Sequence, residues 1–156
     1  MNWEAVGAVG EILGALAVVA SLVYLAIQIK SQNRESRIAA VHDVLEAYRN
    51  QISVLTDESF SKLYIRGLSD FEGLDDAERM RLTSGVHGVF RVWEEAFYLL
   101  KESRLDDNHW VGMDRLCADL KASQIGEHAW ELRKHGYSVE FQKYVDSREP
   151  GEYRFR

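Results

Sequence analysis

A 25-residue apolar run near the start of the chain, AVGAVGEILGALAVVASLVYLAIQI, constrains the fold more than any other feature. It covers residues 5–29 and carries one ionisable side chain, Glu11. An α-helix rises about 1.5 Å per residue, so the uninterrupted part over residues 12–29 is about 27 Å long, close to the hydrocarbon thickness of a bilayer. We therefore expect a transmembrane anchor over residues 1–30 and a single-pass protein in contact with a lipid bilayer.

Two other interpretations of this run are a secretory signal peptide and the core helix of a soluble domain. A signal peptide needs a basic segment before a shorter apolar core, whereas residues 1–4 include no Lys or Arg. Helices buried in soluble domains rarely hold so long an apolar run. Both alternatives are disfavoured, and a retained membrane helix is expected.

The charges that flank the run predict its orientation. Lys30, Arg34 and Arg37 follow it, while Glu4 is the only charged side chain before it. Because cytoplasmic flanks of membrane helices are rich in Lys and Arg, the N-terminus should lie outside and the C-terminal part in the cytoplasm. The side chains expected to anchor the helix at the two interfaces are Trp3, Tyr24 and Lys30.

The run has two unlike faces when it is followed at alternating steps of three and four residues. One face, apart from Tyr24, is small or polar, and Gly10 and Gly14 on it have the GxxxG spacing that lets membrane helices approach closely. We predict a homo-oligomer, or packing against another membrane protein, through this small-residue face. The predicted interface consists of Gly7, Gly10, Gly14, Ala17 and Ser21, and the opposite aliphatic face of Ile12, Leu16, Val19, Val23 and Ile27.

Two polar residues accompany the small-residue face: Glu11 borders it and Gln28 lies on it. A charged carboxylate facing lipid costs several kcal/mol, so Glu11 is expected to face water or protein, or to be protonated. Three explanations stay open for Glu11: solvation at the outer headgroups, pairing with another chain, or a ring of carboxylates at the mouth of a cation pore. Glu11 and Gln28 are the candidate pore or interchain residues.

The helix is expected to continue past the membrane, because no Pro or Gly occurs between residues 15 and 56. One helix of about 50 residues would be roughly 75 Å long. Residues 31–55 would then form a juxtamembrane helix or stalk with an apolar stripe at helical spacing. The positions of this stripe are Ile38, Val41, Leu45, Tyr48, Ile52 and Leu55.

Residues 56–149 are predicted to form a small cytoplasmic helical bundle, followed by a loose or docking tail over 150–156. Thr56 and Asp57 form a candidate N-cap region, Asp106 is expected to begin a helix, and Ser138 is a candidate cap of the last helix. Asp75 with Glu78 has the spacing of a capping box. No alternating strand pattern persists, so the fold class is all-α. Gly67, Gly136 and Pro150 are the expected helix ends, and the expected core stripe is Leu82, Val86, Val89, Phe90, Trp93, Phe97 and Leu100.

Charge and cysteine content limit the possible partners and location. The chain has 19 basic and 25 acidic residues, a formal charge of −6, which argues against general nucleic-acid binding. Its single cysteine, Cys117, can form no intramolecular disulfide, which fits a reducing compartment. Met113, Leu116 and Leu120 surround it in helical spacing and predict a buried structural thiol.

The sequence contains no recognisable catalytic pattern. The five histidines form no H-E-x-x-H pair and no zinc-type spacing with the cysteine. His87 and Glu94 lie two turns apart on one helix face, where an ion pair of Glu94 with Arg91 or Lys101 is the simpler explanation. There is no Gly-rich phosphate loop and no nucleophile elbow. We therefore expect neither enzymatic activity nor a metal or cofactor.

Four segments carry a resemblance to a known family. They are WEAVGAVGE at residues 3–11, GALAVVASLVYLAIQI at 14–29, the basic polar stretch KSQNRESR at 30–37, and FRVWEEAFYLLKE at 90–102. With these segments the chain resembles a broad family of small, uncharacterised bacterial single-pass membrane proteins. The resemblance implies a location in the bacterial cytoplasmic membrane and no particular activity.

Two functions follow from these patterns. In the first, the protein is a self-associating, membrane-anchored scaffold or accessory subunit that presents its helical domain to partners. In the second, the homo-oligomer is a cation-conducting channel with a Glu11 ring. A scaffold can have a dry, close-packed small-residue face, whereas a pore needs that face to line an open axis. We expect the scaffold.

Overall fold

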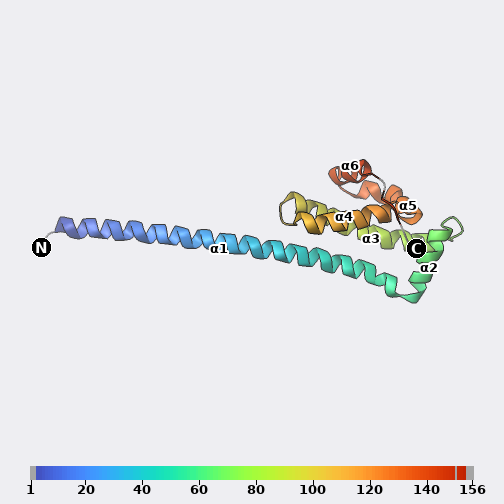
Figure 1. The fold of residues 1–156 in the computed structure, drawn as a ribbon, viewed down its shortest axis with the longest axis horizontal. Coiled ribbons are helices and arrows are strands. Elements are labelled where there is room, and N and C mark those ends of the chain that lie inside the picture. The colour runs from blue at the N-terminus through green and yellow to red at the C-terminus, as the bar shows by residue number, and fades with distance from the viewer. Residues whose placement is uncertain (1–2, 150, 154–156) are drawn as a thin grey trace. The chain divides into compact units, whose positions relative to one another are not determined.

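The computed structural model describes residues 3–149 and 151–153, except for the side chains of residues 5 and 6, and every regular element within them is helical. A long N-terminal helix precedes a bundle of shorter ones (Figure 1), which confirms the all-α class. The elements are α1 (Trp3–Ser53), η1 (Val54–Thr56), α2 (Glu58–Ser69), α3 (Asp76–Lys101), α4 (Asp107–Lys121), α5 (Gln124–Arg133), η2 (Lys134–Gly136) and α6 (Val139–Ser147).

Helix α1 is continuous over 51 residues, as the absence of Pro and Gly from its second half predicts. Backbone contacts divide the chain into two compact units, Met1–Ala39 and Ala40–Arg156. Within the described residues the first unit consists of the N-terminal part of α1 alone. The second unit holds the C-terminal part of α1 and all later elements. The division therefore falls inside the segment expected to form the juxtamembrane helix.

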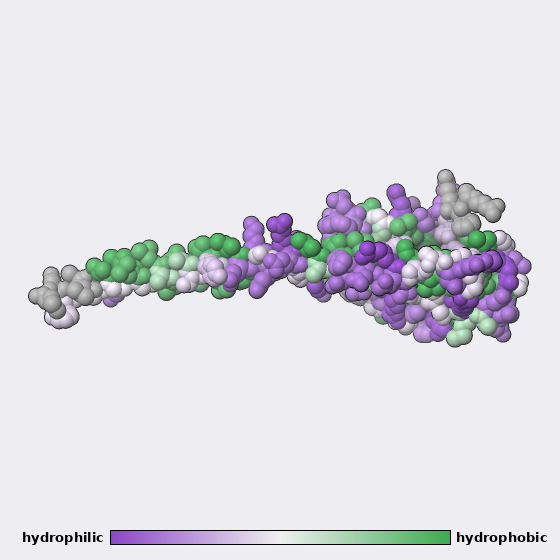
Figure 2. All heavy atoms as spheres, turned by 90° about the horizontal axis from the view of Figure 1, so that it is seen from below, coloured by the Kyte–Doolittle hydropathy of each residue, from purple (hydrophilic) through white to green (hydrophobic). Residues whose placement is uncertain are grey.

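In the first unit, every described side chain is exposed. Large aliphatic residues such as Ile12 and Leu16 are each 61% exposed. Figure 2 shows this part of α1 as a largely apolar stretch that gives way to a polar surface further along the helix. Such a contiguous apolar surface is unfavourable in water and is typical of segments that contact a membrane or another protein.

Helix α3 lies at the centre of the core of the second unit and packs against α4 and α5. Trp93 and Phe90 on α3 are fully buried. Trp93 meets Phe141 of α6 edge-on with ring centroids 5.4 Å apart, and Phe90 meets Trp130 of α5 at 5.9 Å. The predicted core stripe is confirmed: Leu82, Val86, Val89, Phe90, Trp93 and Phe97 are buried and Leu100 is half-buried.

The predicted apolar stripe of residues 31–55 is partly wrong. Ala40 and Val44 are the buried positions of this segment, 3% and 1% exposed, whereas Leu45 is 42% exposed and Ile38 60%. Apolar residues occupy two adjacent faces of this part of α1, so hydropathy alone does not choose between them. In the second unit the face with the smaller side chains, Ala40 and Val44, is buried because small residues let the helix lie close to its neighbours.

The predicted helix starts are confirmed by their caps. Asp57 accepts a hydrogen bond from the Phe60 amide at 2.8 Å, and Asp75 and Glu78 form both bonds of a capping box. The side chains of Asp106 and Ser138 cap α4 and α6 in the same way. These caps form because an oxygen-bearing side chain satisfies amides that the first helical turn leaves unpaired.

Two predicted helix ends are wrong. Helix α2 continues past Gly67 to Ser69, and Gly67 is buried where a Cβ atom would lie 2.6 Å from Leu82 Cδ1. This glycine permits close packing of α2 on α3 instead of ending a helix. Gly136 lies in η2 without a positive φ, so it is no left-handed cap. Pro150, expected to end the last helix, lies outside the described residues, and α6 ends at Ser147.

Candidate functional site

The small-residue face of α1 is uncovered in the single chain. A Cβ atom built on Gly7, Gly10 or Gly14 would meet nothing within 4 Å. Ala17 and Ser21 continue this face and are exposed. The helix therefore brings all five predicted interface residues onto one side, and none of them is buried by the described part of the chain.

Local hydrogen bonds lower the cost of placing the polar side chains of α1 in an apolar environment. The Ser21 hydroxyl donates to the Ala17 carbonyl oxygen at 2.8 Å, and the Gln28 amide donates to the Tyr24 hydroxyl at 2.7 Å. A polar group without such a partner would cost several kcal/mol in hydrocarbon. The predicted interface anchors Trp3, Tyr24 and Lys30 are all exposed.

Glu11 is exposed, and no hydrogen bond or ion pair joins it to another described residue. Any partner for its carboxylate must therefore come from outside the described chain, as water, a lipid headgroup or another protein chain. By length and composition α1 is the one helix of the described residues able to cross a membrane, with a mean hydropathy of 2.4 over its most apolar 18-residue window.

The second unit contains a buried polar network centred on Asp114, which is 5% exposed. Its Oδ1 accepts hydrogen bonds from Trp93 Nε1 at 3.1 Å and from the Tyr144 hydroxyl at 2.6 Å. Its Oδ2 lies 2.6 Å from Arg148 Nη2. Burial, and then the hydrogen bond to Asp114, raise the pKa of Tyr144. Each of these groups is satisfied within the fold, so the network joins α3, α4 and the end of α6.

A second polar cluster contains His87 and Glu94. Arg91 forms the predicted ion pair with Glu94 at 2.8 Å, and the Tyr137 hydroxyl lies 2.7 Å from His87 Nδ1. Lys101 pairs with Glu140 instead. Burial lowers the pKa of His87 from its usual value, and the nearby arginines add to this effect. Through the contact between His87 and Tyr137, the cluster joins α3 to the segment before α6.

Cys117 is buried, as predicted, with 1% of its surface exposed. Burial raises the pKa of its thiol, which keeps the sulfur protonated and unreactive. Among the described residues, no group of three or more His, Cys, Asp or Glu side chains is placed to hold a metal ion.

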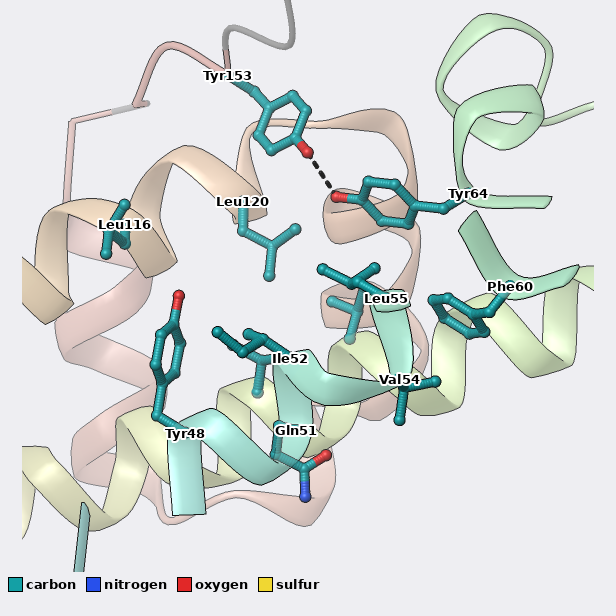
Figure 3. Close-up of a pocket in the computed structure, with 13 residues that line it drawn as sticks. Tyr48, Gln51, Ile52, Val54, Leu55, Phe60, Tyr64, Leu116, Leu120 and Tyr153 are labelled. Atoms are coloured by element: carbon teal, nitrogen blue, oxygen red, sulfur yellow. Dashed lines mark hydrogen bonds between the residues drawn. The ribbon is translucent and has the colours of Figure 1, made fainter. Parts of the chain in front are cut away.

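The second unit also contains an apolar cavity of about 180 Å³, which sequence reasoning missed (Figure 3). Its walls come from the end of α1, η1, α2, α3, α4 and the segment after α6. Figure 3 shows Ile52 and Leu120 pointing into the same space, while the Gln51 amide points away from it. A hydrogen bond of 2.7 Å between the hydroxyls of Tyr64 and Tyr153 closes one side. The one sequence signal related to the cavity was the expectation that the tail over residues 150–156 could dock, because Tyr153 of this segment lines the cavity.

No family model, no curated protein and no solved structure matches this chain.

Proposed function

We propose that the protein is a self-associating, single-pass membrane protein that acts as a scaffold or accessory subunit and carries a helical domain. The observation that carries the proposal is the complete exposure of an apolar helix over the described part of Met1–Ala39. Aliphatic surface is stabilised when lipid or protein replaces the water around it. The gain in free energy is about 25 cal/mol for each Å² of apolar surface removed from water. Lipid suits the aliphatic face of this helix.

Self-association is supported by the difference between the two faces. Lipid tails solvate Ile12, Leu16 and Val19 well, but the open surface over Gly10 and Gly14 offers lipid few contacts. A second copy of the helix can approach that surface closely and fill it. A homo-oligomer is therefore the favoured assembly, and packing against a different membrane protein is the alternative partner.

The proposed location is the bacterial cytoplasmic membrane, with the N-terminus outside and the helical domain in the cytoplasm. This topology rests on Lys30, Arg34 and Arg37, which follow the apolar run and are all exposed. The buried, protonated thiol of Cys117 is compatible with a reducing compartment.

A cation channel is the second candidate function, and Glu11 favours it. Its carboxylate has no partner among the described residues, and it borders the face proposed to meet other copies. Copies of Glu11 around one axis would attract cations. The scaffold remains the first proposal because a close-packed small-residue face leaves no open axis.

Subunit number tests the first proposal. The full-length protein, purified in a mild detergent and in lipid nanodiscs, should have the mass of two or more chains. Gly14→Ile should weaken the oligomer, because its side chain forces the helices apart, whereas Val23→Leu on the aliphatic face should leave it intact. A monomer in both media, or equal behaviour of the two variants, would contradict self-association through this face.

A further inference from the structure

The cavity of the second unit has the chemistry of a small-molecule site. None of the thirteen described residues that line it is charged. Four of them carry polar side chains, and two of these, Tyr64 and Tyr153, hydrogen-bond to each other. Since the Gln51 amide points away (Figure 3), Tyr48 is left as the polar group that faces the apolar walls.

Tyr48 is half-buried, and no hydrogen bond joins its hydroxyl to another described residue. A phenol in an apolar setting normally finds a hydrogen-bond partner. A ligand that occupies the cavity can supply this partner with a single oxygen atom, while its remaining atoms contact aliphatic side chains such as Ile52 and Leu120.

The volume limits the size of the ligand. An engineered apolar cavity of about 150 Å³ holds one benzene molecule. A cavity of about 180 Å³ therefore accommodates about six or seven carbon atoms. This is too little space for the several side chains that a protein partner would insert, and it suits one short alkyl chain.

We propose that this cavity binds the alkyl chain of a small uncharged amphiphile, such as a medium-chain alcohol, with the Tyr48 hydroxyl bonded to its polar end. Because none of the described lining residues is charged, an ionised head inside the cavity is disfavoured. The ligand enters beside Leu116, which lines the cavity and is 56% exposed.

The test uses full-length protein in phosphatidylcholine nanodiscs and an alkanol that carries a photoreactive diazirine. After illumination, labelled peptides are identified by mass spectrometry. Labelling of residues 48–55 and 116–120 should be saturable. Unlabelled 1-alkanols from four to ten carbons should compete for the site. Each added methylene should strengthen the competition about fourfold until the chain has about seven carbons, and longer chains should compete no better. A steady increase through ten carbons, or no saturable labelling, would overturn the proposal.

Matched variants locate the site on the molecule. Leu116→Trp places a large ring at the entrance and should abolish competition by 1-hexanol. Val111→Trp changes an equally exposed residue of α4 that does not line the cavity. In this variant 1-hexanol should compete as strongly as in the wild type. Equal labelling of the two variants in residues 48–55 would overturn the proposal.

The role of Tyr48 is tested by Tyr48→Phe, which removes only the hydroxyl. A neutral hydrogen bond is worth about fivefold in affinity, so competition by 1-hexanol should weaken by about that factor. Competition by n-hexane, which has no polar atom, should not change. An equal change for both competitors would overturn the assignment of Tyr48 to the polar end of the ligand.

Discussion

Replacing Asp114 by Ala should destabilise the helical domain strongly, because it removes the partner shared by the buried Trp93, the half-buried Tyr144 and the exposed Arg148. The largest cost comes from Trp93, which is fully buried and cannot turn its Nε1–H to water. An unsatisfied buried donor costs about 1–3 kcal/mol. The half-buried Tyr144 loses one hydrogen bond, about 1 kcal/mol. The Arg148 side chain is 40% exposed, so water replaces most of what it loses.

The free energy of unfolding should therefore fall by about 3 kcal/mol in Asp114→Ala. Urea unfolding of the full chain in nanodiscs, followed by tryptophan fluorescence, measures this difference. Asp114→Asn keeps the oxygen that accepts from Trp93 and Tyr144, so it should lose less than the alanine variant. Its new amide faces Arg148, which makes some loss unavoidable.

Asp146→Ala is the matched control for this substitution. Asp146 accepts a hydrogen bond from Trp130 Nε1 at 2.8 Å, the same kind of bond, but Asp146 is exposed. Water can take its place, so the loss should stay below about 1 kcal/mol. If the two alanine variants lost equal stability, burial of the acceptor would not be what makes the Asp114 network important.

Three further predictions concern pH, topology and conduction. Burial raises the pKa of Tyr64 and Tyr144 above the usual value near 10. The unfolded chain therefore loses these protons first, so the tyrosine contribution to the free energy of unfolding should be constant below pH 10 and fall above it, less steeply in Tyr144→Phe. A cysteine replacing the exposed Glu72 should resist an impermeant thiol reagent added outside intact cells and react after lysis, with the buried Cys117 silent throughout; labelling from outside would reverse the topology. In planar bilayers the wild type should pass no current over a wide range of pH and voltage; a cation-selective current that Glu11→Gln alters would favour the channel instead.

Local interactions made the helix starts predictable from the sequence. Asp75 and Glu78 are three residues apart, and their two hydrogen bonds form within one turn of α3. The same holds for Asp57 and the Phe60 amide. A cap depends on residue type and spacing alone, so the sequence contains all the information it needs. The continuity of α1 past the membrane-spanning run was predictable for a similar reason, because no Pro or Gly occurs between residues 15 and 56.

Long-range packing was not predictable in this way. Asp114 was not singled out, because its partners Trp93 and Arg148 are 21 and 34 residues away and meet it only in the folded bundle. Gly67 has the sequence appearance of a helix end, yet its lack of a side chain is needed for contact with Leu82. The cavity likewise exists only where five helical elements and the segment after α6 come together.

Both parts of α1, on either side of the boundary between the two units, present a face of small side chains. In the second unit, Ala40 is 3% exposed and Val44 1%, since small side chains let the helix lie against the bundle. In the first unit, Gly10 and Gly14 have no side chain, so a second helix could approach even more closely there, and nothing in the described chain covers them. Glycine inside a helix costs about 1 kcal/mol relative to alanine. Three glycines on one face of a single helix would therefore be a net loss of stability unless another helix packs against them, which is the physical argument for self-association.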